Sequence, residues 1–466
     1  MERVLWWARR DLRLADNRAL NAALNQAEQV VPVFVLDPML LERYEASTKR
    51  LAFLFGGLRA LDRDLRARGS RLVIRRGRPA DELAALVDET GAGAVFAEED
   101  FSPYARERDE RVAKRMSLRL EGSHLVHPPG SVLKSDGDPY VAFTWFARTW
   151  KSLPVPGPGD LLPSPERLPT LGDVASLSIP DQPGLPDQVP FPPGETEAQA
   201  RLAAFARGEQ APIERYAERR DRMDLDGTSR LSPYLRFGML SARQAIVAAR
   251  ERSGEGAAAW LDELIWREFY SHILYHFPKV LDRSFRAAYR DLAWEDDQSA
   301  FEAWCEGRTG YPVIDAAMRQ LVQSGWMHNR ARMAVAAFLT KDLLIDWRWG
   351  ERFFMVHLID GDPAANNGGW QWAAGTGTDA APYFRIFNPV LQGETHDPQG
   401  AYVRRWVPEL AQVPDQFVHS PWEMAAERQR ELGCIIGEDY PRPIIEHSRA
   451  RKRALERYKE AKHGSS

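Results

Sequence analysis

The chain has 466 residues, a formal net charge of −4 at pH 7 and a charged fraction of 27%. This length is too great for one ordinary domain, and an apolar fraction of 44% is typical of a soluble globular protein with a sizeable core. The charge excludes a chain that is basic throughout, so any binding to nucleic acid must come from a local patch of cations.

The two cysteines, Cys305 and Cys434, can build neither a disulfide framework nor a metal site, so we expect a cytoplasmic protein without a metal. The first residues read MERVLWWARRDLR and lack the apolar segment of a signal peptide, so we predict a first strand there. No run of about 18 apolar residues occurs, and we expect no membrane partner.

Short apolar runs alternate with helical patterns in residues 1–130. The predicted strands are Val4–Ala8, Val30–Leu36, Leu72–Ile74, Ala94–Ala97 and His124–Val126. The predicted helices are Asn17–Gln26, Lys49–Ala67, Pro79–Thr90 and Tyr104–Leu118. This alternation predicts an α/β domain with a parallel five-stranded sheet and helices on both faces. The segment after the first strand lacks G-x-G-x-x-G, which argues against a dinucleotide fingerprint.

Two aspartates, Asp37 and Asp100, follow predicted strands of this domain. The carboxyl ends of parallel strands are the usual ligand site of such a sheet. The domain is therefore either a scaffold or the holder of a ligand at these strand ends, and the residues alone leave both interpretations open.

Proline is concentrated in residues 151–200, which hold 12 of the 32 prolines. Because proline removes a donor and fixes φ, we predict an extended connector over residues 131–200 and an all-α domain over 201–466. Helical periodicity marks six segments of the latter: 198–207, 241–252, 256–276, 311–324, 328–343 and 446–461. The last is basic and amphipathic, which suits a solvated surface or, as the lesser alternative, a DNA contact.

The first of four clusters that can bind a ligand is DGTSRLSPYLRFG at 226–238. Hydroxyls at a predicted helix start suit either a capped helix or a phosphate site, because four N–H groups there lack partners. The second is AWLDELIWREFY at 259–270, which places Trp260, Glu263, Arg267 and Tyr270 on one helix face with Trp266 beside it. An ordinary Glu–Arg surface pair does not account for the two tryptophans.

The third cluster lies at the end of residues 310–333, where Asn329, Arg330, Arg332 and Met333 fall within little more than one helical turn. The ordinary interpretation is a cationic helix end. The fourth is the stretch from Asp342 to Pro389, which contains four tryptophans, a pair of aspartates one residue apart (Asp360 and Asp362), two adjacent asparagines (Asn366 and Asn367) and a glycine pair. Aromatic rings with a few placed polar groups are typical of a ligand site.

The residues DGDPAANNGGWQWAAGTGTDAAPYFRIFNP, from 360 to 389, resemble the flavin-binding core of the photolyase/cryptochrome family. The likeness is strongest to class I photolyases, which repair cyclobutane pyrimidine dimers. The three clusters before it fit the same family, and RRDLRLADN and FVLDP resemble its antenna domain.

The resemblance implies bound FAD, and it implies these cofactor residues: Tyr216, Thr228, Ser229, Arg230, Leu231, Ser232, Trp260, Glu263, Arg267, Trp326, Asn329, Arg332, Asp360, Asp362 and Asn366. It implies contacts to damaged DNA, single- or double-stranded, from Trp266, Glu263, Asn329, Arg330, Met333, Trp372 and Arg385. Arg404 and Arg405 are weaker phosphate candidates. It implies an electron-transfer chain of Trp294, Trp347 and Trp370, which without the family would be ordinary core residues.

The implied activity is light-driven repair, in which photoexcited reduced FAD passes an electron to a dimer flipped out of the DNA and recovers it after the dimer splits. Asn366 favours repair over signalling, because at this position photolyases carry Asn, whereas plant cryptochromes carry Asp and animal cryptochromes carry Cys. Asn329 replaces the second histidine usual in photolyases for (6-4) lesions. A cryptochrome-type photoreceptor and a flavin electron-transfer protein without DNA remain alternatives.

We predict that Arg332 pairs with Asp360, because a buried charge near the flavin needs a partner. A second, antenna chromophore (a deazaflavin, a folate or a flavin such as FMN) is expected near Asp37 and Asp100 if one is present. We expect a monomer.

Overall fold

The computed structural model describes residues 1–43 and 47–464. Contacts between Cα atoms divide the chain into two compact units. Unit 1 comprises Met1–Ala217, Thr228–Pro278 and Ile359–Ala364, and unit 2 comprises Glu218–Gly227, Lys279–Leu358 and Ala365–Ser466. The boundaries expected at residues 130 and 200 stay predictions, since contacts do not show which parts fold independently.

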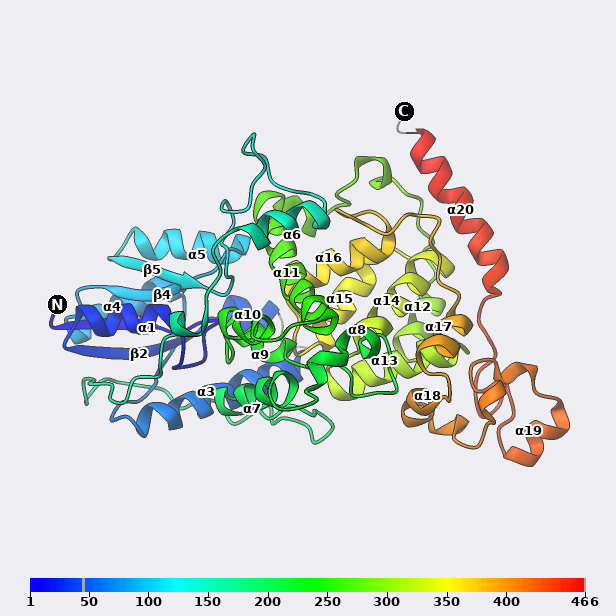
Figure 1. Cartoon of the computed structure of the whole chain (residues 1–466), viewed down its shortest axis with the longest axis horizontal. Coiled ribbons are helices and arrows are strands. Elements are labelled where there is room, and N and C mark those ends of the chain that lie inside the picture. Colours follow the sequence, from blue (N-terminus) through cyan, green and yellow to red (C-terminus); the bar gives the residue numbers. More distant parts are fainter. Residues whose placement is uncertain (44–46, 465–466) are drawn as a thin grey trace. The chain divides into compact units, whose positions relative to one another are not determined.

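Unit 1 begins with a parallel sheet of five strands in the order β3-β2-β1-β4-β5 (Figure 1). The strands are β1 (Arg3–Trp7), β2 (Gln29–Leu36), β3 (Val73–Arg76), β4 (Val95–Glu99) and β5 (Leu118–Ser123). The helices along this part of the chain are α1 (Arg18–Gln26), α2 (Pro38–Arg43), α3 (Thr48–Arg66), α4 (Pro79–Thr90) and α5 (Pro103–Ala113). The predicted α/β class is confirmed, and the three central strands β1, β2 and β4 are almost wholly buried.

The last predicted strand was wrong. β5 spans Leu118–Ser123 rather than His124–Val126, and α5 ends at Ala113 rather than Leu118. β5 is an edge strand whose residues are half-buried or exposed, so it lacks the apolar run that marks the inner strands. The residues after β5 pair with a side chain instead of with a strand: the backbone N–H groups of Val126 and His127 donate to the carboxylate of Glu268.

The proline-rich segment lies along the opposite edge of the same sheet. The Leu177 N–H donates to the Ile74 carbonyl at 2.9 Å, and the Ile74 N–H donates to the Ser176 hydroxyl at 2.9 Å. The segment thereby occupies hydrogen-bonding groups of the edge strand β3, which would otherwise invite another chain.

Unit 1 also contains a helical part, with α6 (Phe143–Ser152), α7 (Glu195–Ala206), α9 (Ser232–Phe237), α10 (Ala242–Arg250) and α11 (Glu255–His276). α11 packs against α6 and α10. Ser241 caps α10 by accepting from the Gln244 N–H, while the Gln244 side chain accepts from the Ser241 N–H. This reciprocal capping box explains where α10 begins.

Unit 2 is helical. Its helices are α12 (Gln298–Cys305), α13 (Pro312–Ser324), α14 (Asn329–Ala337), α15 (Trp347–His357), α17 (Pro389–His396), α18 (Ala401–Trp406), α19 (Ala426–Leu432) and α20 (His447–Gly464). Most residues of α16 (Pro363–Ala374) also belong to unit 2, and α8 (Tyr216–Arg219) contains the point where the chain passes from unit 1 to unit 2. The helix predicted over 328–343 continues beyond α14 as a π-helical turn, Phe338–Asp342, whose five residues are all buried. No helix in the described part of the chain is both long and apolar enough to cross a membrane.

Candidate active site

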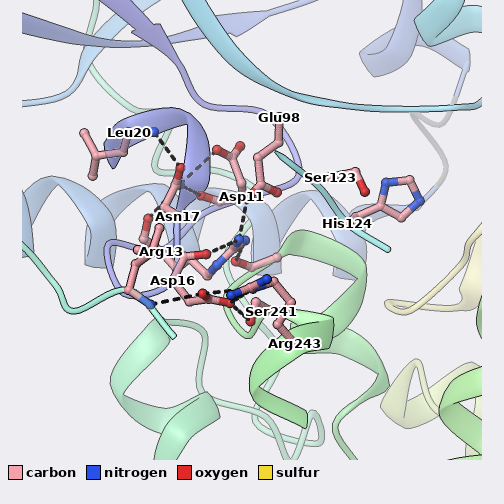
Figure 2. Close-up of polar contacts among 12 residues, drawn as sticks. Asp11, Arg13, Asp16, Asn17, Leu20, Glu98, Ser123, His124, Ser241 and Arg243 are labelled. Atoms are coloured by element: carbon pink, nitrogen blue, oxygen red, sulfur yellow. Dashed lines mark hydrogen bonds and ion pairs between the residues drawn. The ribbon is translucent and has the colours of Figure 1, made fainter. Parts of the chain in front are cut away.

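The loop after β1, RRDLRLADN, forms a buried polar network in unit 1 (Figure 2). Arg13 pairs with Glu98 and donates to the Gly238 carbonyl at 3.1 Å. Asp16, which is 0% exposed, accepts from the Ser241 hydroxyl at 2.6 Å and pairs with Arg243 at 3.1 Å. The network ties the sheet to the end of α9 and the start of α10, so much of this motif has a structural role.

The two aspartates expected at an antenna site have protein partners. Asp37 accepts from the Tyr104 hydroxyl and from the Met39 N–H, and burial raises its pKa. Asp100 accepts from the Ser102 N–H and lies 3.6 Å from Arg10. Burial would raise the pKa of Asp100, but the charges of Arg10, His124 and Arg108 together with the hydrogen bond from Ser102 outweigh it and hold the pKa low. A role of either residue toward a chromophore stays a prediction.

The serine- and threonine-rich segment from Thr228 to Ser232 leads into α9. The N-cap residue of α9 is Leu231, and no side chain caps the helix. Arg230 has a positive φ of 50°, which non-glycine residues rarely adopt. The hydroxyls of this segment therefore do not cap α9, contrary to the ordinary interpretation. Tyr216 is buried, and its ring lies edge-on to Phe205, which also contacts Trp260.

Helix α11 carries an aromatic platform. The half-buried indole of Trp266 stacks on Phe143 with ring centroids 3.7 Å apart and an interplanar angle of 6°. Phe269 lies edge-on to Trp266 at 5.5 Å, and Tyr270 lies at 5.4 Å. Glu263, three residues before Trp266, is half-buried on the same helix. The predicted grouping on α11 is thus present, and Phe143 adds a ring that the sequence did not indicate.

The loop Ile359–Ala364 carries both aspartates of D-G-D. Asp362 pairs with Arg10 at 2.6 Å, and the Arg236 side chain donates to the Gly361 carbonyl at 2.8 Å. Arg267 donates to the His124 carbonyl at 2.9 Å, and burial lowers its pKa to about 10. A small cavity of unit 1 is lined by Arg10, Asp100, His124 and Asp362, among others. Asp360 is buried, and its predicted pairing with Arg332 stays a prediction.

In unit 2, the start of α14 gathers the predicted third cluster. His328 accepts from the Arg330 N–H, and Arg330 pairs with Asp221 at 2.7 Å. Arg332 donates to the Met327 carbonyl at 2.9 Å, and the amide of Asn329 lies 3.8 Å from the sulfur of Met333. Trp326 is buried close by in the chain. Asp221 partly neutralises the positive charge of Arg330, which we expected to contact DNA.

Asn366 lies on α16 with its orientation set by the backbone of α15. Its Nδ2 donates to the Glu351 carbonyl at 3.0 Å, and Asn367 donates to the Glu351 carboxylate at 3.0 Å. Burial raises the pKa of Glu351 to about 7. One helical turn beyond Asn366, a Cβ added at Gly369 would meet no atom within 4 Å. The oriented amide of Asn366 can accept a hydrogen bond, and the space beside Gly369 can admit a flat ring. Both features fit reduced flavin, which has a hydrogen-bond donor at N5.

The three tryptophans expected to transfer electrons all lie in unit 2. Trp347 and Trp370 are 0% and 2% exposed, and Trp370 packs where Gly350 leaves room on α15. Trp294 is half-buried and lies edge-on to Tyr458 at 6.4 Å. Within the described ranges, the Nε1–H groups of Trp347 and Trp370 are buried and donate to no hydrogen-bond partner. Trp372 is half-buried, Arg385 is exposed, Arg404 pairs with Asp415, and Arg405 lies over the Trp406 ring.

Two family models match the chain. DNA photolyase matches residues 4–166, and the FAD-binding domain of DNA photolyase matches residues 260–460. The deoxyribodipyrimidine photo-lyase of Synechococcus sp. is 41% identical, with 98% of this chain and 97% of the relative covered. The chain belongs to the DNA photolyase family. The second match spans the residues from Trp260 to Arg385, so the FAD-binding domain of the family includes α11, α14 and α16.

Solved structures agree with this assignment of the photolyase fold. A bacterial class III photolyase from Agrobacterium tumefaciens superposes with a TM-score of 0.92 at 36% identity, covering 99% of this chain and 98% of that one. A cryptochrome from Synechocystis sp. superposes with a TM-score of 0.89 at 29% identity, covering 98% and 99%. The fold is therefore shared by repair enzymes and a cryptochrome, and the choice between them depends on individual residues.

Four residues of the site were missed by the sequence analysis: Phe143, Arg10, Arg236 and Glu351. Phe143 and Arg10 lie far along the chain from the residues they contact, so periodicity gave no signal for them. Glu351 lies on α15, between the tryptophan-rich turn and the D-G-D loop, and its spacing of 15 residues from Asn366 has no local meaning.

Proposed function

We propose that this protein repairs cyclobutane pyrimidine dimers in UV-damaged DNA by light-driven electron transfer. The observation that carries the proposal is the aromatic platform of α11, where Phe143 backs the indole of Trp266. A flat indole fixed in this way can stack on a pyrimidine pair extruded from DNA. Glu263, on the same helix, can hydrogen-bond or protonate the carbonyl edge of the dimer.

The resident cofactor of this proposal is FAD, which when bound supplies the light-excited electron donor. The chain's own residues hold and tune it: the segment from Thr228 to Ser232 takes the pyrophosphate, while Asn366 offers its amide to N5. Because the Nδ2 of Asn366 already donates to the Glu351 carbonyl, its Oδ1 is oriented to accept a hydrogen bond. An acceptor at N5 suits the reduced ring, and repair needs the reduced ring.

Trp266→Ala tests the proposal. Base–aromatic stacking contributes about 1–3 kcal/mol per base, so we expect the affinity for an oligonucleotide with one thymine dimer to fall roughly 10- to 100-fold. Affinity for the undamaged oligonucleotide should not change. Trp406→Ala, which removes a half-buried tryptophan outside the platform, is the matched control. Equal losses for damaged and undamaged DNA would contradict a lesion-binding role.

A cryptochrome-type photoreceptor is the second candidate, and the similarity to the Synechocystis cryptochrome favours keeping it. Repair of the dimer oligonucleotide under blue light, with none in darkness, separates the two. Membership of class I rather than class III, the monomeric state and the identity of an antenna chromophore all stay predictions.

A further inference from the structure

The D-G-D loop belongs to unit 1, although the chain on both sides of it belongs to unit 2. Its six residues, Ile359–Ala364, are therefore held by contacts with residues far away in the sequence. Asp362 fixes the start of α16, because its Oδ1 accepts from the Ala364 N–H at 3.0 Å. The same helix carries Asn366. Asp362 thus links its own partners to the first turn of α16.

Arg10 is the residue that holds Asp362. Its Nη2 donates to Asp362 Oδ2 at 2.6 Å, its Nη1 lies 3.6 Å from Asp100, and its Nε donates to the Arg236 carbonyl at 3.4 Å. Arg236 in turn donates to the Gly361 carbonyl at 2.8 Å, but it lies 3.9 Å from the Asp362 carboxylate. The side chains of Arg10 and Asp362 are only 18% and 19% exposed. Arg10 is therefore a short-range partner of Asp362 in a poorly hydrated site.

The backbone of Arg10 is fixed as well. A Cβ added at Gly238, the C-cap of α9, would lie 1.7 Å from the Arg10 carbonyl oxygen. Gly238 also has a φ of 63°, which glycine adopts without strain. This close approach, with the Leu12 N–H donating to the Phe237 carbonyl at 3.1 Å, seats the β1 loop on the end of α9.

The geometry points to Arg10 as a positioning residue for FAD, acting through Asp362 and the loop Ile359–Ala364. This inference rests on the proposed function, since it requires FAD at the D-G-D loop. It also reassigns part of RRDLRLADN, because Arg10 lies in the segment that resembles the antenna domain. The neighbouring Arg9 has a different partner, Asp109 on α5, at 2.7 Å.

The two adjacent arginines provide a matched experiment. The affinity for FAD is measured by titrating apoprotein of the full chain and following the quenching of flavin fluorescence. Arg10→Gln removes the guanidinium that lies 2.6 Å from the Asp362 carboxylate, so we expect FAD to bind about 10-fold more weakly or worse. Arg10→Lys keeps the charge and should recover part of the affinity. Arg9→Gln removes a guanidinium that is even more buried, and it should leave FAD affinity within about 2-fold, because the partner of Arg9 is not on the loop.

A double-mutant cycle shows whether Arg10 acts through Asp362. In Asp362→Asn the carboxylate is gone, so adding Arg10→Gln should weaken FAD binding less than it does in the wild type. Multiplicative losses, or equal losses in Arg9→Gln and Arg10→Gln, would overturn the inference and leave a general effect on folding. If the wild-type chain bound no FAD, the proposed function itself would fail. If the wild type bound FAD and Arg10→Gln bound it equally well, only the positioning role would fail.

Discussion

Two buried regions of the molecule differ in how their polar atoms are partnered. In unit 1, Arg13 and Asp16 are each paired with an opposite charge, and together they join the sheet to α9 and α10 (Figure 2). In unit 2, as far as the structure describes it, the indole N–H groups of Trp347 and Trp370 are buried without a partner. Native proteins rarely leave a buried donor unpaired. Arg13 Nε and Glu98 Oε2 of the first region also lack a hydrogen-bond partner, so an unpaired atom does not by itself mark a functional site. The paired region joins elements of the fold, whereas electron transfer through the tryptophans of unit 2 stays a prediction.

Arg13→Met should break the paired region and have the largest effect. It leaves the buried Glu98 without its guanidinium, and breaking a buried pair costs about 3–5 kcal/mol. Urea unfolding followed by circular dichroism measures the loss. The control is Arg63→Met, because the Arg63 side chain is 73% exposed and its pair is 3.9 Å long. That change should stay within about 0.5 kcal/mol, and similar losses in both variants would refute a structural role of the network.

Trp304→Phe and Trp347→Phe sharpen the comparison within unit 2. Both residues are 0% exposed, but the Trp304 Nε1 donates to the Val335 carbonyl at 3.1 Å. Trp304→Phe removes this buried hydrogen bond, although the Val335 carbonyl still accepts from the Phe338 N–H, so it should cost up to about 1.5 kcal/mol more than Trp347→Phe. Trp347→Phe should instead slow the light-driven reduction of bound FAD. Equal losses of stability would mean that the indole N–H of Trp347 has a partner in solution.

The smallest effect concerns Lys341, which is 0% exposed. Its ammonium group contacts the Tyr383 carbonyl and the Tyr458 ring rather than a carboxylate. Burial lowers its pKa to about 7, while an unfolded lysine titrates near 10.4. Between these values the unfolded chain binds more protons, so stability rises with pH. From pH 7 to pH 8 we expect a gain on the order of 1 kcal/mol that Lys341→Met lacks. Parallel pH profiles for the two proteins would show that Lys341 is hydrated and titrates normally.

The local sequence pattern was enough to predict most strands and helices of the α/β part. The inner strands are short, continuous apolar runs because they are buried on both faces, and α4 was predicted to the residue because Pro79 starts it and Gly91 ends it. β5 was misplaced because an edge strand with exposed residues has no such run. The π-helical turn at Phe338–Asp342 was also missed, since a run of buried residues reads as ordinary helix.

Sequence by itself determined the family and the composition of the candidate site, because residues 360–389 and the tryptophans of α11 lie in contiguous segments whose spacing a helix preserves. Only the tertiary structure decided which residues support them. Phe143 reaches Trp266 across 123 residues, and Arg10 reaches Asp362 across 352. Contacts between residues so far apart produce no periodic pattern in the sequence, because they depend on how the elements pack rather than on how each element forms.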